Sequence, residues 1–276
     1  CGQAVAQICQ RIMSDERFIK KPNLPENDVT LCVCSDSDTA RLLASCGITV
    51  LQTKLTPYTQ PEVSRHADMQ MCHLGGADIV ADKFQTELTD ELKRHGFNII
   101  TDVLTKPNYP DEICFNAAIC GGCLFGLQRF LSRSLKIRAE KDGLKLVNIR
   151  QGYAKCSVCT VAEKAIITDD SGIAHTAAKL GFDVLEIGKG DIYLSDSHYG
   201  FIGGCSGKIS KDKVVFTGSL DSHSSGRQIR AFLQAHGCNA IELTQDRLKD
   251  VGGILPVKEE KKCIHSESTS EAPNAQ

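Results

Sequence analysis

Hydrophobic and polar residues follow a pattern that repeats five times along the chain. Each copy has an apolar strand, a Ser-, Thr- or Asp-rich helix start, an amphipathic helix, a Gly and a second apolar strand. The clearest copy has a strand at 165–168, a helix start at 169–171 and a strand at 182–185. Glycine is common after a helix because it adopts positive φ at little steric cost. The five glycines in that position are Gly47, Gly96, Gly143, Gly181 and Gly237.

The two ends of this repeated pattern predict how the fold closes. The first copy lacks the hairpin strand that precedes the helix in later copies, and an unpaired strand-like segment lies at 252–257. Pairing that segment with the first copy leaves no exposed sheet edge. We therefore predict a five-fold pseudosymmetric α/β-propeller of strand-strand-helix-strand repeats, closed by the C-terminal strand. A doubly wound parallel sheet is the alternative, although no glycine-rich phosphate motif follows an early strand.

Domain limits follow from where the periodicity starts and stops. We predict one domain over residues 1–257 and a disordered tail over 258–276, where mixed charges give way to a Ser-, Ala- and Pro-containing segment without apolar spacing. Val5, Ile8, Cys9 and Ile12 have helical spacing, which predicts a helix docked on the domain. A lipid-modified Cys1 is the alternative for this end of the sequence.

Composition narrows the class of protein. The 276 residues are 41% hydrophobic and 24% charged, as in globular chains, and no apolar run approaches the roughly 20 residues of a membrane span. A net charge of -2 disfavours binding to nucleic acid or to a membrane surface. Most of the 14 cysteines stand in apolar strand-like runs, unlike a secreted disulfide scaffold. These features predict a reduced, cytoplasmic protein.

Three residues are the candidates for catalysis. Cys205 follows Gly203 and Gly204, which would let the backbone approach a ligand and leave the sulfur exposed on a turn. His66 could act as a general base and Asp68 could bind a cation, if both point inward from one extended strand. A buried small Cys, and a hydrogen-bonded turn containing His66 and Asp68, are the alternatives that need no catalytic function.

Polar residues near the predicted strand starts are candidate ligand contacts, because a propeller would direct them into its central channel. His73 and His223 could contribute, although a single His is more often a surface or hydrogen-bonded residue. The candidate substrate-binding residues are Gln70, Asn116, Gln151, Tyr153, Lys155, Gly203 and Gly204.

Two Cys-x-x-Cys motifs raise the question of a metal. Cys120 and Cys123 flank two glycines and could form a tight turn or a redox dithiol, and with Cys156 and Cys159 they would supply four thiolates for zinc or an iron-sulfur cluster. Strand alternation would place Cys156 and Cys159 on opposite faces, with Lys155 on the face of Cys159. We therefore predict no metal and no cofactor, with a cysteine-ligated metal protein as an alternative.

Three motifs carry a family resemblance. The segments 66–70 (HADMQ), 151–156 (QGYAKC) and 199–207 (YGFIGGCSG) resemble an uncharacterised family assigned to the guanidino-group-modifying, or pentein, superfamily. That superfamily includes arginine and agmatine deiminases, and the resemblance covers roughly residues 28–257. It implies a five-fold α/β-propeller with a central channel that holds acidic residues for the guanidinium, a His-x-Asp pair and a nucleophilic Cys on the closing strand.

The sequence departs from that pattern in two places. His66 and Asp68 stand before the strands of the second copy, whereas the enzymes carry the His-x-Asp pair in a later copy. Ile254, Leu255 and Pro256 follow the glycines of the closing strand, so that strand lacks the thiol. We expect a guanidino or amino-acid-like ligand in the channel, with hydrolase or transferase chemistry at Cys205. The alternative is a non-catalytic propeller that binds a macromolecular partner, as the ribosome-associated initiation factor of this fold does.

Overall fold

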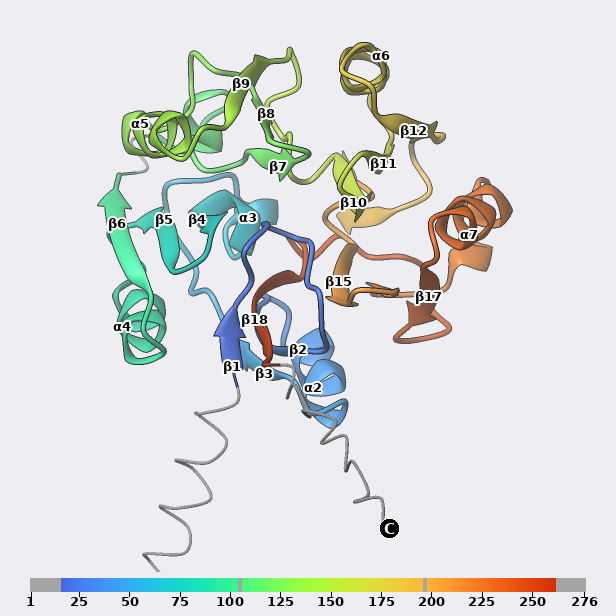
Figure 1. Ribbon diagram of the computed structural model, residues 1–276, viewed down its shortest axis with the longest axis horizontal. Coiled ribbons are helices and arrows are strands. Elements are labelled where there is room, and N and C mark those ends of the chain that lie inside the picture. The colour runs from blue at the N-terminus through green and yellow to red at the C-terminus, as the bar shows by residue number, and fades with distance from the viewer. Residues whose placement is uncertain (1–15, 104–105, 196–197, 262–276) are drawn as a thin grey trace, which may run out of the picture.

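The computed structural model describes residues 16–103, 106–195 and 198–261. The helix expected around Val5 to Ile12 lies outside these residues. The fold is mixed α/β, with several small sheets and helices between their strands. Figure 1 shows helices α4, α5, α6 and α7 at the periphery, around the short helix α3 and strand β18.

Four units share one plan, in which two antiparallel strands form a hairpin, a helix follows, and a third strand pairs parallel to the second. The second unit contains β4 (Met71–Gly75), β5 (Asp78–Asp82), α4 (Thr86–Arg94) and β6 (Asn98–Asp102). The third contains β7 (Ala118–Cys120), β8 (Cys123–Gly126), α5 (Arg133–Lys141) and β9 (Lys145–Asn148). The fourth contains β10 (Val158–Ala162), β11 (Ala165–Thr168), α6 (Ser171–Lys179) and β12 (Asp183–Glu186). The fifth contains β15 (Ser206–Ser210), β16 (Lys213–Phe216), α7 (Gly226–Ala235) and β17 (Asn239–Glu242).

The first unit is completed by the other end of the chain. It contains β2 (Val29–Val33), α2 (Ser37–Ser45) and β3 (Thr49–Leu51), and β18 (Leu255–Glu260) pairs antiparallel with β2 where the other units have their own hairpin strand. Strand β1 (Glu16–Phe18) then pairs with the outer edge of β18. The predicted pairing of the last strand with the first unit is confirmed. The remaining short elements are α3 (Ala67–Gln70), β13 (Tyr193–Ser195), β14 (His198–Tyr199), and 3-10 turns at Pro61–Val63, Asp111–Ile113 and Leu220–Ser222.

Local signals explain the helix limits. The side chains of Asp36 and Asp170 accept hydrogen bonds from amides in the first turns of α2 and α6, as N-caps do. All five glycines predicted to end helices have positive φ. Strand β18 extends past the predicted boundary at residue 257, to Glu260, and Lys258 and Glu259 are buried in it, beside β1. Residues 262–276 lie outside the described part of the chain.

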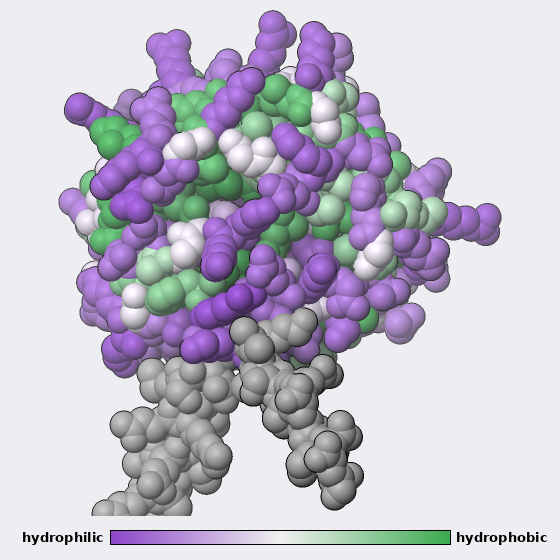
Figure 2. Space-filling model, viewed as in Figure 1, coloured by the Kyte–Doolittle hydropathy of each residue, from purple (hydrophilic) through white to green (hydrophobic). Residues whose placement is uncertain are grey.

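The hydrophobic core is divided between neighbouring units. Separate clusters join the first unit to the second, the second to the third, the third to the fourth and the fourth to the fifth. A further cluster joins the fifth to the first, where Val215 packs with Val29 and Ile254. Each unit therefore buries both faces of its sheet against its neighbours. Figure 2 shows one face of the molecule, on which hydrophilic side chains predominate and hydrophobic surface is visible between them.

None of the helices in the described ranges has the length and apolar character needed to cross a membrane.

Candidate functional site

The segments that enter the second, third and fourth units converge at one place. Asp68 lies in α3 just before β4, Asn116 lies just before β7, and Cys156 lies just before β10. These positions are equivalent in the repeated plan, so neighbouring units bring the three side chains together. All three are buried. A carboxylate, a carboxamide and a thiol thus meet where three units of the fold come into contact.

Cys156 is the thiol at this centre. Its Sγ donates to Oδ2 of Asp68 at 3.0 Å, and Nδ2 of Asn116 lies 3.1 Å from the same sulfur. Burial raises the pKa of the Cys156 thiol well above its usual range, and the nearby carboxylates of Asp68 and Asp250 raise it further. Burial also raises the pKa of Asp68, although His66 and Lys155 act in the opposite direction. The surroundings therefore disfavour a negative charge on either group.

His66 and Asp250 border the same centre. His66 is the residue before α3, and its Nδ1 lies 3.7 Å from Oδ1 of Asp250 without a hydrogen-bond partner among the described residues. The carboxylate of Asp250 is held by the backbone N–H groups of Phe201 and Gly252, each at 2.9 Å. The expectation that His66 and Asp68 share one extended strand is wrong, because a helical turn begins at Ala67.

Two cavities meet at this centre. The first has a volume of about 240 Å³ and is lined by Cys156, the rings of Tyr153, Tyr199 and Phe201, and the carboxylates of Glu62 and Asp250. The second has a volume of about 560 Å³, contains His66, and shares Glu62, Leu194 and Asp250 with the first. We call the first the aromatic cavity. Its described lining contains acidic and aromatic side chains and no Lys or Arg, which suits a cation.

A buried carboxylate fixes one wall of the aromatic cavity. Oη of Tyr153 donates to Oε1 of Glu112 at 2.6 Å, and the backbone N–H of Gln60 donates to Oε2 of Glu112 at 2.7 Å. Burial and this hydrogen bond raise the pKa of Tyr153, so its phenol stays protonated. The Tyr153 ring lies 6.0 Å from the Phe201 ring between centroids. This wall is therefore held in place without a ligand.

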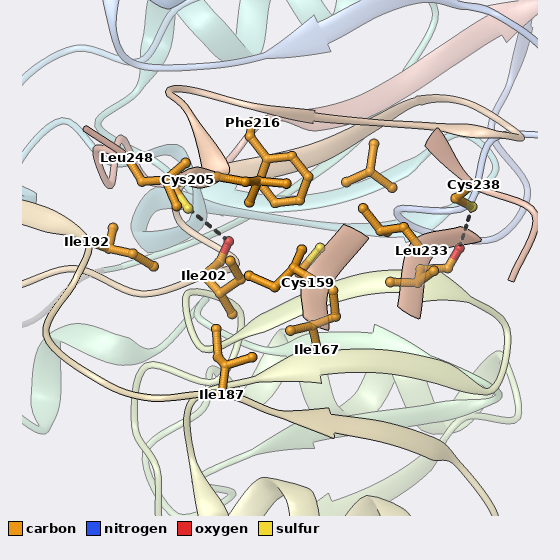
Figure 3. Packing of buried hydrophobic residues seen from close by; sticks show 14 of the residues in the cluster. Cys159, Ile167, Ile187, Ile192, Ile202, Cys205, Phe216, Leu233, Cys238 and Leu248 are labelled. Atoms are coloured by element: carbon orange, nitrogen blue, oxygen red, sulfur yellow. Dashed lines mark hydrogen bonds between the residues drawn. The ribbon is translucent and has the colours of Figure 1, made fainter. Parts of the chain in front are cut away.

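Cys205 is not at the site. It is fully buried between the fourth and fifth units, and its Sγ donates to the carbonyl of Ile202 at 3.4 Å. Figure 3 shows its sulfur among Ile192, Phe216 and Leu248. Burial raises the pKa of this thiol well above its usual range. The expectation of an exposed nucleophile is wrong, and the alternative of a small buried cysteine describes this residue.

Gly203 and Gly204, which precede Cys205, make room for other parts of the chain and not for a ligand. A Cβ on Gly203 would lie 2.3 Å from the carbonyl oxygen of Lys155, and one on Gly204 would lie 2.0 Å from Oδ1 of Asp250. They permit close approach, as predicted, but the approaching atoms belong to the chain itself. Gly203 and Gly204 thereby let the segment of Cys156 and the carboxylate of Asp250 pack against the fifth unit.

The other residues predicted to contact a ligand either hold the structure together or lie at the edge of the site. Gln70 donates to the carbonyls of Lys54 and Ser64 and is buried, so it holds a loop. Gln151 bonds Asp170 and the backbone N–H of Tyr153 at the edge of the site. Lys155 is buried and lines a separate small cavity together with Cys72 and His73.

The two Cys-x-x-Cys motifs do not come together. Cys120 and Cys123 pack in the cluster between the third and fourth units, whereas Cys159 lies in the next cluster and Cys156 faces Asp68. In the part of the chain that the structure describes, no three His, Cys, Asp or Glu side chains are arranged to hold a metal ion.

Sequence reasoning missed three functional candidates. Cys156 was assigned to a strand, whereas β10 begins only at Val158 and Cys156 lies in the turn before it. Glu112 and Asp250 were not considered. A usable signal existed for Cys156, since it ends one of the three motifs that carry the family resemblance. Asp250 had a weaker one, an acidic residue two positions before the glycines of the closing segment.

The sequence matches one known protein family. The profile described as "Family of unknown function (DUF6873)" matches residues 34–255, which is most of the chain. The chain belongs to this family. No curated protein matches the DUF6873 chain in sequence. The family assignment therefore carries no activity with it.

Solved structures similar to this DUF6873 chain are guanidino-modifying enzymes. SxtG, an amidinotransferase from Microseira wollei, has 9% identity and a TM-score of 0.55, over 89% of this chain and 97% of its own. The inosamine-phosphate amidinotransferase StrB1 from Streptomyces griseus has 12% identity and a TM-score of 0.56, over 87% and 97%. An agmatine deiminase from C. jejuni has 9% identity and a TM-score of 0.50, over 89% and 96%. The predicted pentein resemblance is confirmed as a shared fold.

Proposed function

We propose that this protein binds a guanidino or similar cationic small molecule in the aromatic cavity and cleaves a C–N bond of its amidino group through Cys156. The observation that carries the proposal is the Cys156 thiol, which lines that cavity and is hydrogen-bonded to Asp68. We further propose that the five units form one α/β-propeller domain and that the protein acts in the cytoplasm as a hydrolase or transferase.

The lining of the cavity supports a cationic ligand. The carboxylates of Glu62 and Asp250 attract positive charge, and the faces of Tyr153, Tyr199 and Phe201 favour a flat or alkylated cation. The similar structures are named as amidinotransferases and an agmatine deiminase, and a ligand with an amidino group is consistent with these names.

The same charges explain how the thiol could become reactive only with ligand present. Burial and the carboxylates of Asp68 and Asp250 hold the pKa of Cys156 high, so the thiol is protonated when the cavity is empty of cations. A bound amidinium would offset these negative charges and lower the pKa of the thiol. The proton of Cys156 would pass to Asp68, which already accepts its hydrogen bond at 3.0 Å.

The covalent step then follows from the positions of the groups. The sulfur of Cys156 attacks the amidino carbon and forms a C–S bond, and the C–N bond to the leaving amine breaks. The leaving nitrogen takes the proton that Asp68 has accepted from the thiol, so the amine departs neutral. Water or a second amine later displaces the sulfur, and the proton returns to Cys156.

A pair of alkylating reagents tests the proposal. Chloroacetamidine carries an amidinium and chloroacetamide is its neutral analogue of the same size. We expect chloroacetamidine to alkylate Cys156 at least tenfold faster at pH 7.5 by peptide mapping, and Cys156→Ala to abolish this labelling. Cys205→Ala is the matched control and should leave it unchanged. Equal rates for the two reagents, or an unlabelled Cys156, would contradict the proposal.

A non-catalytic binding function is the second candidate. One observation favours it, since Ile254 and Leu255 are buried where the closing strand begins, and the similar enzymes are expected to place their nucleophile on that strand. If chloroacetamidine leaves Cys156 unlabelled, while a cationic ligand such as methylguanidine still raises the melting temperature, this second candidate is supported.

A further inference from the structure

We infer that Asn116 is a positioning residue for Cys156, which holds the thiol against Asp68 and donates an N–H to its sulfur. The inference rests on the proposed function of Cys156. It replaces the prediction from sequence that Asn116 contacts a ligand. Asn116 is fully buried and lines neither of the two cavities at the centre, so its side chain acts on the protein itself.

The hydrogen bonds of Asn116 join two segments far apart in the sequence. Oδ1 accepts from the backbone N–H groups of Lys155 at 2.7 Å and Cys156 at 3.4 Å. Nδ2 lies 3.2 Å from the backbone carbonyl of Asp68. One carboxamide therefore connects the turn that carries the thiol to the helix that carries its carboxylate partner. Removing it frees both segments to move relative to each other.

The orientation of this carboxamide is fixed by its surroundings. Two backbone N–H groups can only be matched by an acceptor, so Oδ1 must face Lys155 and Cys156. Nδ2 then faces the carbonyl of Asp68 and the sulfurs of Met69 and Cys156, which are all acceptors. Reversing the amide would place donors against donors. The sulfur of Cys156 thus receives an N–H.

This N–H has an electrostatic consequence. Burial and the carboxylates of Asp68 and Asp250 raise the pKa of Cys156, whereas the hydrogen bond from Asn116 lowers it. A donor stabilises a thiolate more than a thiol, and the effect is larger in a buried site of low dielectric constant. Asn116 therefore offsets part of the penalty for forming the nucleophile. The Asn116 carboxamide is neutral, so it stabilises the thiolate without competing for the proton.

Two substitutions test these contacts of Asn116. Asn116→Leu removes every hydrogen bond of the side chain at similar volume. Asn116→Asp keeps an acceptor for the Lys155 and Cys156 N–H groups but places an oxygen in place of the N–H at the sulfur. Gln85→Leu is the matched control, because Gln85 is another buried carboxamide that bonds both the N–H and the carbonyl of one residue, Lys54, away from Cys156.

The experiment is the rate of Cys156 alkylation by neutral chloroacetamide from pH 7 to pH 11, followed by peptide mapping on the full chain. We expect both Asn116 variants to shift the rate profile to higher pH, with at least a tenfold slower reaction at a fixed pH below the midpoint. Gln85→Leu should lower the melting temperature without moving the profile. If Asn116→Asp folds and keeps the wild-type profile, or if Gln85→Leu moves it equally, the inference is overturned.

The chloroacetamide profile can be interpreted even if the proposed function is wrong. Chloroacetamide reports the thiol itself and needs no ligand site. A failure of chloroacetamidine to label Cys156 preferentially would contradict the proposed function, while the chloroacetamide profile would still decide whether Asn116 stabilises the thiolate.

Discussion

Buried carboxylates occur at the candidate site and also away from it. Asp68 and Glu112 have partners that suit a functional centre, whereas Asp169 lies at the end of β11 with one carboxylate oxygen lacking a hydrogen-bond partner among the described residues. Burial raises the pKa of Asp169 from 3.8 to about 7, although Lys189 and two backbone N–H groups act in the opposite direction. Its ionisation therefore opposes folding.

The pH dependence of stability should show this effect. Because the pKa of Asp169 is raised on folding, its contribution to stability is fully present below about pH 4 and is lost as the pH rises to about 7. We expect Asp169→Asn to raise the free energy of unfolding at pH 8 by up to roughly 4 kcal/mol relative to its effect at pH 4. Chemical denaturation at both pH values measures the difference. Exposed Asp246→Asn should change neither value, and an equal effect of Asp169→Asn at both would contradict the assignment.

The contrast between Cys156 and Cys205 shows how far a functional residue can be predicted from its neighbours in the sequence. Glycines beside Cys205 correctly indicated that something approaches the backbone closely, but a sequence cannot tell a ligand from the chain's own Asp250. Asp68 and His66 were found because their types suit the chemistry. Cys156 was missed because strand alternation was extended two residues too far, and its partners Asp68 and Asn116 are 88 and 40 residues away.

Elements were easier to predict than side-chain positions, because their signals are local. The five helices and the glycines that end them follow from apolar spacing and from the backbone freedom of Gly. Helix α3 has only four residues and leaves no periodic pattern, so the helical turn that carries Asp68 could not be anticipated. The closing segment is recognisable as a strand in the sequence, but the close approach of Gly252 to His66 joins residues far apart in the sequence and could not be predicted.

Gly252 and Gly237 provide a test at this scale. Both have positive φ, at 77° and 67°, so a side chain on either is strained by about 1 kcal/mol. Around Gly237 a Cβ would meet open space, whereas on Gly252 it would lie 2.4 Å from Cβ of His66. We expect Gly252→Ala to lower stability clearly more than Gly237→Ala, and to slow chloroacetamidine labelling of Cys156 severalfold. Equal melting temperatures for the two variants would show that the segment of His66 moves away from the added methyl group at no cost in stability.

At the scale of the whole molecule, one buried carboxylate links the closing strand to the N-terminal segment. Glu259 of β18 is almost fully buried and accepts from Nε of Arg17 at 2.8 Å and from the backbone N–H groups of Glu26 and Asn27. These contacts join the last strand to β1 and to the segment before β2. The position of the strand was predictable from the sequence, but its length was not, because Lys258 and Glu259 have the composition of a solvated tail.

Substitution of Glu259 tests this closure. Glu259→Ala leaves Arg17 and two backbone N–H groups without their shared acceptor, and we expect a loss of about 3 kcal/mol in the free energy of unfolding. Glu260→Ala, on the exposed neighbour, should cost less than about 0.5 kcal/mol. Urea denaturation compares the two variants. A similar small effect for both would mean that the contacts of Glu259 contribute little to closure.

The pairing of β1 with β18 has a consequence for chain connectivity. Glu16 is directly opposite Glu260, so the two ends of the described chain lie side by side. The contacts between these two ends depend on their closeness in space, and not on the order of the units along the chain. A circular permutant that joins these ends through a flexible linker and starts at the glycine turn between β7 and β8 should fold to the same arrangement. Its Cys156, Asp68 and Asn116 would meet as before, although their order along the chain would change.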